Sequence, residues 1–139
     1  MLRWSASCRK SRRTDDASIF KAGAKVMSGR REAILDVAER LIRARGYSGF
    51  SFRGIASDVG IKSASVHYHF PTKPDLAAAV AKRYRERFAT ALEAEERQGV
   101  VRVEAWRGLF YTALKRDGLM CLCGILAVEG AGLPTQVAK

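Results

Sequence analysis

The segment from Ile61 to Phe70, IKSASVHYHF, concentrates side chains that can donate hydrogen bonds. Small residues fill positions 63–65, and His67, Tyr68 and His69 follow directly. Imidazole and phenol groups can donate to phosphate oxygens, and their flat faces suit thymine methyl groups. Small residues at the start of a helix let its backbone approach base edges in the DNA major groove, which is about 12 Å wide. This composition is typical of a helix that reads DNA.

The elements that must position this helix are predicted by apolar spacing and by turn residues. From Ser28, apolar residues recur three and four positions apart as far as Gly46, as in a helix of about four turns. Ser51 can cap a short second helix that ends at Gly60, and the third helix follows at about 63–70. Two short helices joined by a glycine turn form a helix-turn-helix motif, whose second helix enters the major groove.

Three more helices are predicted after this motif. Thr72 can cap a long fourth helix that runs to Gln98, a fifth ends near Gly118, and an apolar sixth precedes a glycine-rich turn. We therefore predict an all-α fold, in which a three-helix DNA-binding domain at 28–74 precedes an incomplete helical domain at 75–139. We expect the basic side chains of the fourth helix to be solvated, namely Lys82, Arg83, Arg85 and Arg87.

The charge of the chain favours a polyanionic partner. The formal net charge is +11, and the first thirty residues hold eight Lys and Arg against two Asp. Proteins this basic commonly bind nucleic acid or an anionic membrane surface. Residues 1–27 are interpreted as a flexible basic extension that could add phosphate contacts; alternatively, Met27 is the true start. No stretch approaches the ~20 apolar residues of a membrane span, and an odd count of three cysteines indicates a reducing cytoplasm.

The pattern of residues over Arg31–Leu76 resembles the DNA-binding domain of TetR-type transcriptional repressors. The matching segments are Ile55-Ala56, Val59-Gly60-Ile61, Ser65-Val66-His67-Tyr68-His69-Phe70 and Lys73-Pro74-Asp75-Leu76. The resemblance implies a homodimer that reads an inverted-repeat operator in double-stranded DNA. It also implies that 75–139 is a partial domain for dimerisation and for an unknown small-molecule inducer.

Candidate DNA contacts combine the resemblance with the reasoning from residue types. Lys62 and Lys73 bracket the reading helix and can neutralise phosphates, while Arg53 can reach a phosphate or a guanine edge. His67 occupies a position where the family most often has tyrosine, so we expect DNA binding to weaken from pH 6 to pH 8. The complete candidate set is Ser51, Arg53, Lys62, Ser63, Ala64, Ser65, His67, Tyr68, His69 and Lys73.

Other residues in the sequence suggest functions besides DNA binding. Cys121 and Cys123 could form a thiol-based redox protein or sensor, because nearby basic residues lower a thiol pKa; the alternative is a pair of small buried residues in an apolar helix. The weak candidates for an inducer pocket are Trp106, Phe110 and Tyr111. We expect no metal, no cofactor and no catalytic group. A further alternative is a non-functional, truncated fragment of a regulator, with apolar helix faces left exposed.

Overall fold

The computed structural model describes residues 16–138, with side chains from residue 28 onward. Throughout this range the regular elements are helical and no strand occurs, so the all-α prediction is confirmed. The elements are α1 (Asp16–Arg45), α2 (Phe52–Val59), α3 (Ser63–His69), α4 (Lys73–Arg97), α5 (Arg102–Asp117), α6 (Leu122–Val128), a 3-10 turn (Gly130–Gly132) and α7 (Thr135–Ala138).

The first helix is longer than predicted from Ser28. It begins at Asp16, because the segment after Asp16 is rich in alanine and lysine, which are good helix formers. Residues 1–15 of the predicted basic extension lie outside the described residues.

The predicted glycines end α1 and α2, and the predicted cap residues begin α2 and α4. Gly46 after α1 and Gly60 after α2 have φ angles of 76° and 74°, a left-handed conformation that glycine adopts without strain. The Ser51 hydroxyl accepts a hydrogen bond from the N–H of Gly54 at 3.1 Å and so caps α2. Thr72 and Asp75 form a reciprocal capping box at the start of α4.

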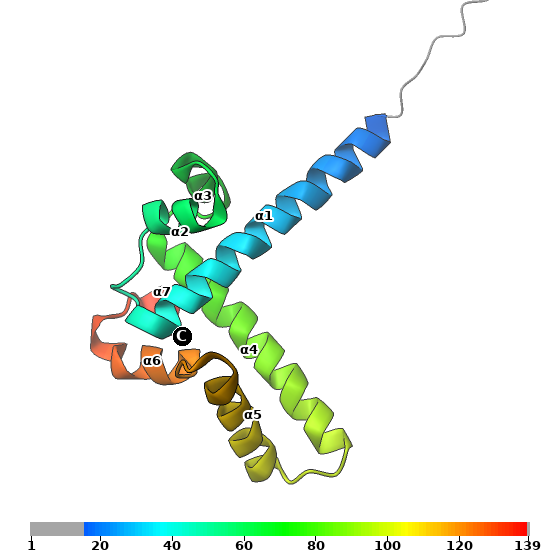
Figure 1. Cartoon of the computed structure of the whole chain (residues 1–139), viewed down its shortest axis with the longest axis vertical. Helices are drawn as coiled ribbons and strands as arrows, with labels where there is room; N and C mark the ends of the chain where they lie inside the picture. The colour runs from blue at the N-terminus through cyan, green and yellow to red at the C-terminus, as the bar shows by residue number, and fades with distance from the viewer. Residues whose placement is uncertain (1–15, 139) are drawn as a thin grey trace, which may run out of the picture.

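Two long helices organise the molecule (Figure 1). α1 and α4 cross, α2 and α3 pack together beside the start of α4, and α5 folds back along the far half of α4. α6 and α7 lie near the crossing point, where they contact α1 and α4. The short helix pair is thereby carried at one end of the molecule.

One continuous core joins the two predicted domains. Its fully buried side chains come from α1, α2, α3, α4 and α6, and include Ile34, Leu35, Ile42, Ile55, Val66, Leu76, Val80 and Leu122. Burying a side chain of this size stabilises the fold by roughly 1.5–3 kcal/mol. The core therefore crosses position 74, since Leu76 and Val80 of α4 pack with the residues of α1 and α2.

Ion pairs between α1 and α4 correct the prediction that the basic face of α4 is solvated. The Arg83 side chain is only 16% exposed and pairs with Glu32 at 2.9 Å and Asp36 at 2.8 Å. It also shares Glu39 with Arg87. The prediction was wrong for Arg83 because the face of α4 that carries it lies against the acidic side of α1.

The far end of the molecule leaves apolar side chains exposed. Val103, Trp106, Tyr111 and Leu114 of α5 are each more than 40% exposed, as expected for helix faces without partners. Within the described range no helix combines the length and apolar composition needed to cross a membrane.

Candidate nucleic-acid interface

The two faces of α3 differ sharply in their environment. Val66 and the capping residue Phe70 are buried in the core. Ala64, His67 and Tyr68 are exposed on the outer side, and Tyr68, at 73%, is among the most exposed large side chains described. The helix thus presents a small residue near its start and two hydrogen-bonding rings further along.

Aromatic contacts surround the two imidazoles of α3, and one of them joins α3 to α2. The His67 ring packs edge-on against Phe52 of α2, with ring centroids 4.5 Å apart, and its Nδ1 lies 3.4 Å from the carbonyl oxygen of Pro71. The rings of Tyr68 and His69 meet at 5.4 Å in a similar edge-on geometry. These contacts orient the imidazoles, because each ring has a neighbour that restricts its rotation.

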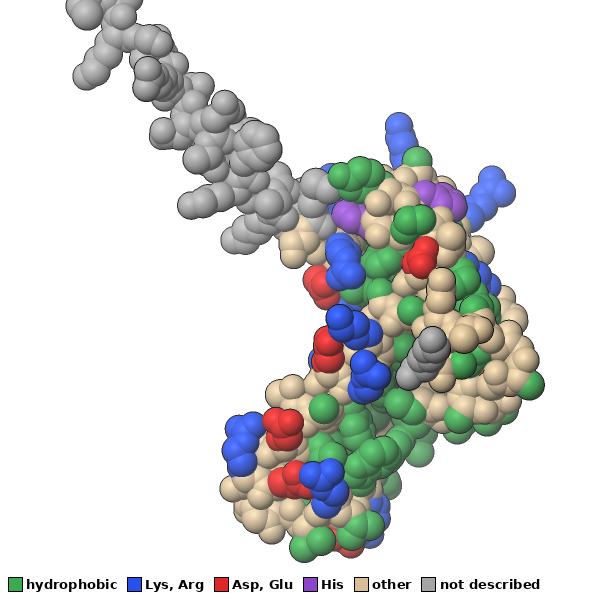
Figure 2. All heavy atoms as spheres, turned by 180° about the vertical axis from the view of Figure 1, so that it is seen from behind, with side chains coloured by type: hydrophobic (Ala, Val, Ile, Leu, Met, Phe, Trp, Pro, Cys, Tyr) green, Lys and Arg blue, Asp and Glu red, His purple; other side chains and the backbone are tan. Residues whose placement is uncertain are grey.

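Two basic side chains flank the exposed face of α3. Arg53 lies in the first turn of α2, and Lys62 is the residue immediately before α3. Both are exposed, and neither forms an ion pair with another described residue. Figure 2 shows both imidazoles at the end of the molecule where basic side chains project into solvent.

The three candidate serines have different roles in the geometry. The Ser51 hydroxyl already accepts the hydrogen bond that caps α2, while its O–H is still available as a donor. Ser63 and Ser65 are half-buried on the first turn of α3. Their small size keeps this turn narrow, which suits a close approach to another molecule.

Lys73 is placed differently from the other candidates. Its Nζ lies 4.5 Å from the centroid of the Phe50 ring, 4.9 Å from that of Tyr47, and 3.5 Å from the carbonyl oxygen of Ser48. Burial lowers the pKa of Lys73, and the negative charge of Glu129 opposes that shift. A phosphate contact by Lys73 stays a prediction, since its ammonium already has partners within the chain.

Arg31 is a cation beside α3 that the sequence reasoning did not select. Its guanidinium carbon lies 5.1 Å from the centroid of the Phe70 ring, and it pairs loosely with Glu32 at 3.5 Å. The pairing of Arg31 with Phe70 spans two helices far apart in sequence. In the sequence, Arg31 was distinguishable only as a basic residue in the first helix of the motif.

Cys121 and Cys123 do not lie in surroundings that would activate a thiol for redox chemistry. Cys121 precedes α6, where its Sγ accepts a hydrogen bond from the N–H of Gly124 at 3.1 Å. Cys123 is exposed, so the prediction of two buried residues was wrong. Although the residue as a whole is exposed, partial burial of its sulfur and the nearby Cys121 raise the pKa of Cys123, which contradicts the expectation of an activated thiol.

The aromatic inducer candidates fall into two places. Trp106 and Phe110 form a cluster with Phe88 of α4, with ring centroids 4.9–5.6 Å apart. Phe110 also lines a cavity of about 280 Å³ between α1, α4 and α5. Tyr111 lies apart from this cluster, exposed, with the Lys115 ammonium 5.1 Å from its ring centroid.

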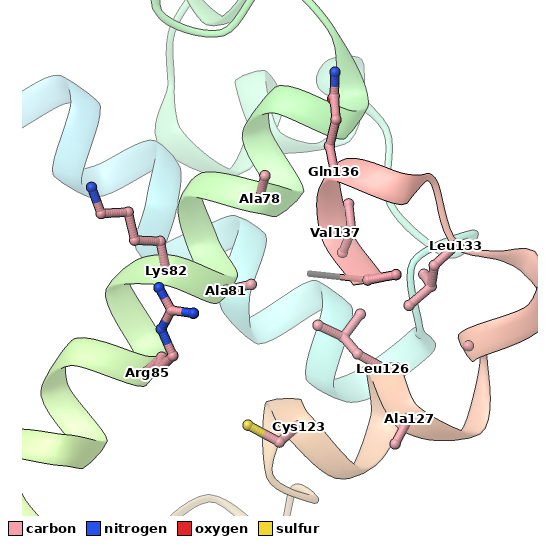
Figure 3. Close-up of a pocket in the computed structure, with 12 residues that line it drawn as sticks. Ala78, Ala81, Lys82, Arg85, Cys123, Leu126, Ala127, Leu133, Gln136 and Val137 are labelled. Carbon is pink, nitrogen blue, oxygen red and sulfur yellow. The ribbon is translucent and has the colours of Figure 1, made fainter.

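A larger groove of about 590 Å³ lies between α4 and the α6–α7 segment. Figure 3 shows the Cys123 thiol pointing from α6 toward α4, and the Arg85 guanidinium extending from α4 at the same end of the groove. Leu126, Leu133 and Val137 form much of its apolar lining. Among the described residues, no group of three or more His, Cys, Asp or Glu side chains is arranged to hold a metal ion.

Comparison with known proteins gives a consistent result. The family described as "Bacterial regulatory proteins, tetR family" matches residues 34–80, which include all of α2 and α3. The "HTH-type transcriptional repressor KstR2" of Rhodococcus jostii is 34% identical over 74 residues, covering 48% of this chain and 36% of the relative. The chain thus spans about a third of the length of that repressor.

Solved structures extend the similarity beyond the matched segment. A TetR-family transcriptional regulator from Agrobacterium tumefaciens has a TM-score of 0.73 and 31% identity, over 80% of this chain and 60% of that one. A TetR transcriptional regulator from Legionella pneumophila has a TM-score of 0.69 and 37% identity, over 77% and 60% of the two chains. The helix-turn-helix geometry and these matches together show that residues 34–80 form a DNA-binding segment of the type found in the tetR family of bacterial regulatory proteins, within a chain whose fold resembles TetR-family regulators.

Proposed function

We propose that the chain is a cytoplasmic transcriptional repressor, without enzymatic activity, that reads an inverted-repeat operator as a homodimer. The observation that carries the proposal is the two-sided α3, whose back is buried while Ala64, His67 and Tyr68 face solvent. A helix that only packed in a bundle would have no need to expose a tyrosine beside two histidines. The boundaries proposed for the DNA-binding and regulatory parts are residues 28–74 and 75–139.

The exposed groups divide into positioning and reading roles. Arg53 and Lys62 carry charges without internal partners among the described residues, which suits contacts to phosphates that set the register of the protein on DNA. Ala64 permits close approach of the helix, and Tyr68 can contact base edges or a thymine methyl group. Specificity in this scheme depends on α3, and affinity depends on the flanking cations.

A small-molecule inducer is the proposed source of regulation. The groove between α4 and α6–α7 supports it, because Arg85 lies beside an apolar lining and has no ion-pair partner among the described side chains. A ligand with an apolar body and a negative charge would match that surface. Because α4 continues from this groove to the base of α3, an occupant that shifts α4 would also shift the reading helix.

The test is a selection of binding sites from a random duplex library, performed with the 139-residue chain at two salt concentrations. Recovery of an inverted repeat supports a dimeric repressor, and recovery of a single half-site supports DNA reading without dimerisation. The Tyr68→Ala variant is the matched control, since Tyr68 is exposed and its loss leaves the core intact. Failure of the chain to enrich any sequence over Tyr68→Ala would refute reading through α3.

A further inference from the structure

The Glu129 carboxylate, from the proposed regulatory part (75–139), lies against the carboxyl end of α1 in the proposed DNA-binding part (28–74), called the DNA-binding head below. Glu129 directly follows α6, and its Oε2 accepts a hydrogen bond from the backbone N–H of Tyr47 at 2.7 Å. A Cβ at Gly46 would overlap with the Glu129 carboxylate, so the absence of a side chain there makes the contact possible. Gly46 is therefore required for the close approach as well as for its left-handed φ angle.

The position of this carboxylate is electrostatically unfavourable by itself. Glu129 lies at the carboxyl end of α1, where the helix dipole places partial negative charge. The Lys73 ammonium also lies beside this end of α1, 3.5 Å from the carbonyl oxygen of Ser48, so its positive charge offsets the unfavourable position of Glu129.

Tyr47 connects the two charges. Its backbone N–H binds Glu129, while its ring lies beneath the Lys73 ammonium together with the ring of Phe50. Cation–π contacts of this kind attract the ammonium electrostatically toward the ring faces. In line with this arrangement, Glu129 raises the pKa of Lys73 against the larger lowering effect of burial.

We infer that Glu129 restrains Lys73 in the notch formed by Tyr47, Ser48 and Phe50, and competes with DNA phosphate for its charge. The inference rests on the proposed DNA-binding function. Its consequence is that α6 sets part of the DNA affinity of the head. Because α6 also lines the larger groove through Leu126, an occupant that moves α6 would change how firmly Lys73 is held.

The test compares DNA affinity in Glu129→Gln with that of the unmodified chain. The amide oxygen of glutamine can still accept from the Tyr47 N–H, so the substitution removes the charge while keeping the hydrogen bond. Binding to a random 20-base-pair duplex is measured by fluorescence anisotropy between 50 and 200 mM salt. We expect roughly three- to fivefold tighter binding at 100 mM salt. The dependence of log K on log salt should also steepen by about 0.9, as for one added phosphate contact.

Two further variants make the result specific. Glu93→Gln changes the net charge equally, but at an exposed position on the far half of α4. Its effect on DNA affinity should therefore be less than about half of the effect of Glu129→Gln. In a Lys73→Met background, Glu129→Gln should have no effect on the affinity or its salt dependence. Equal tightening in that background, or from Glu93→Gln, would overturn the inference.

A measurement without DNA separates this inference from the proposed function. If the unmodified chain binds no DNA, the proposed function fails. The thermal unfolding midpoints of Glu129→Gln, Lys73→Met and the double variant then decide whether the two charges interact. Additive shifts in the midpoint would overturn the restraint, while a smaller shift in the double variant than the sum would support it.

Discussion

Arg43 offers the sharpest test of how the two parts of the molecule are joined. Its side chain is only 5% exposed, although it carries a full charge. The guanidinium donates to the carbonyl oxygens of Met120 at 2.9 Å and Leu119 at 3.1 Å, and to the Asp117 carboxylate at 2.7 Å. All three acceptors lie at or after the end of α5, so a single α1 side chain holds the link between α5 and α6.

The predicted cost of Arg43→Met follows from these contacts. Methionine preserves most of the apolar stem but removes every donor. Two hydrogen bonds from a charged donor to carbonyl oxygens are lost, and at about 1.5 kcal/mol each, the lower end for a charged group, they contribute about 3 kcal/mol. The contact with Asp117 adds nothing to this figure, because Arg116 also donates to that carboxylate and can still pair with it. We therefore expect the free energy of unfolding to fall by about 3 kcal/mol.

Urea unfolding followed by circular dichroism at 222 nm measures this loss. Arg116→Met is the matched control, because Arg116 shares the Asp117 carboxylate but is 68% exposed. Exposed pairs contribute at most about 1 kcal/mol, so the control should lose less than that. A loss in Arg43→Met no larger than in Arg116→Met would refute the reasoning that buried carbonyl contacts join the two parts.

Two other predictions concern DNA reading and pH. Tyr68→Ala should reduce the ratio of specific to random DNA affinity, whereas Lys62→Ala should weaken both alike and reduce the salt dependence by about one; equal effects in both variants would contradict these roles. Hydrogen bonds from Arg116 and then Arg43 hold the pKa of Asp117 well below its ordinary value of 3.8. The stability from this pairing is therefore complete above about pH 4 and is lost as the pH falls further, which thermal unfolding at pH 7 and pH 3 would detect.

Local interactions account for what could be predicted of the helices and the reading face. Ser51 and Thr72 cap their helices through groups within three residues, and Gly46 and Gly60 end α1 and α2 through their own backbone angles. The inward side of α3 was predictable for a similar reason, since residues four apart on a helix share a face. These features depend on neighbours along the chain, which the sequence displays directly.

Tertiary packing decided the partners of the long charged side chains. The sequence indicated that α1 and α4 were amphipathic, but not that Arg83 would lie against the acidic side of α1. It singled out Lys73 as a cation near the reading helix, but not the aromatic rings beneath it or the charge of Glu129. The reason is physical: periodicity specifies which face of a helix is apolar, whereas contacts such as that between Arg43 and Met120, 77 residues apart, exist only once the helices have packed.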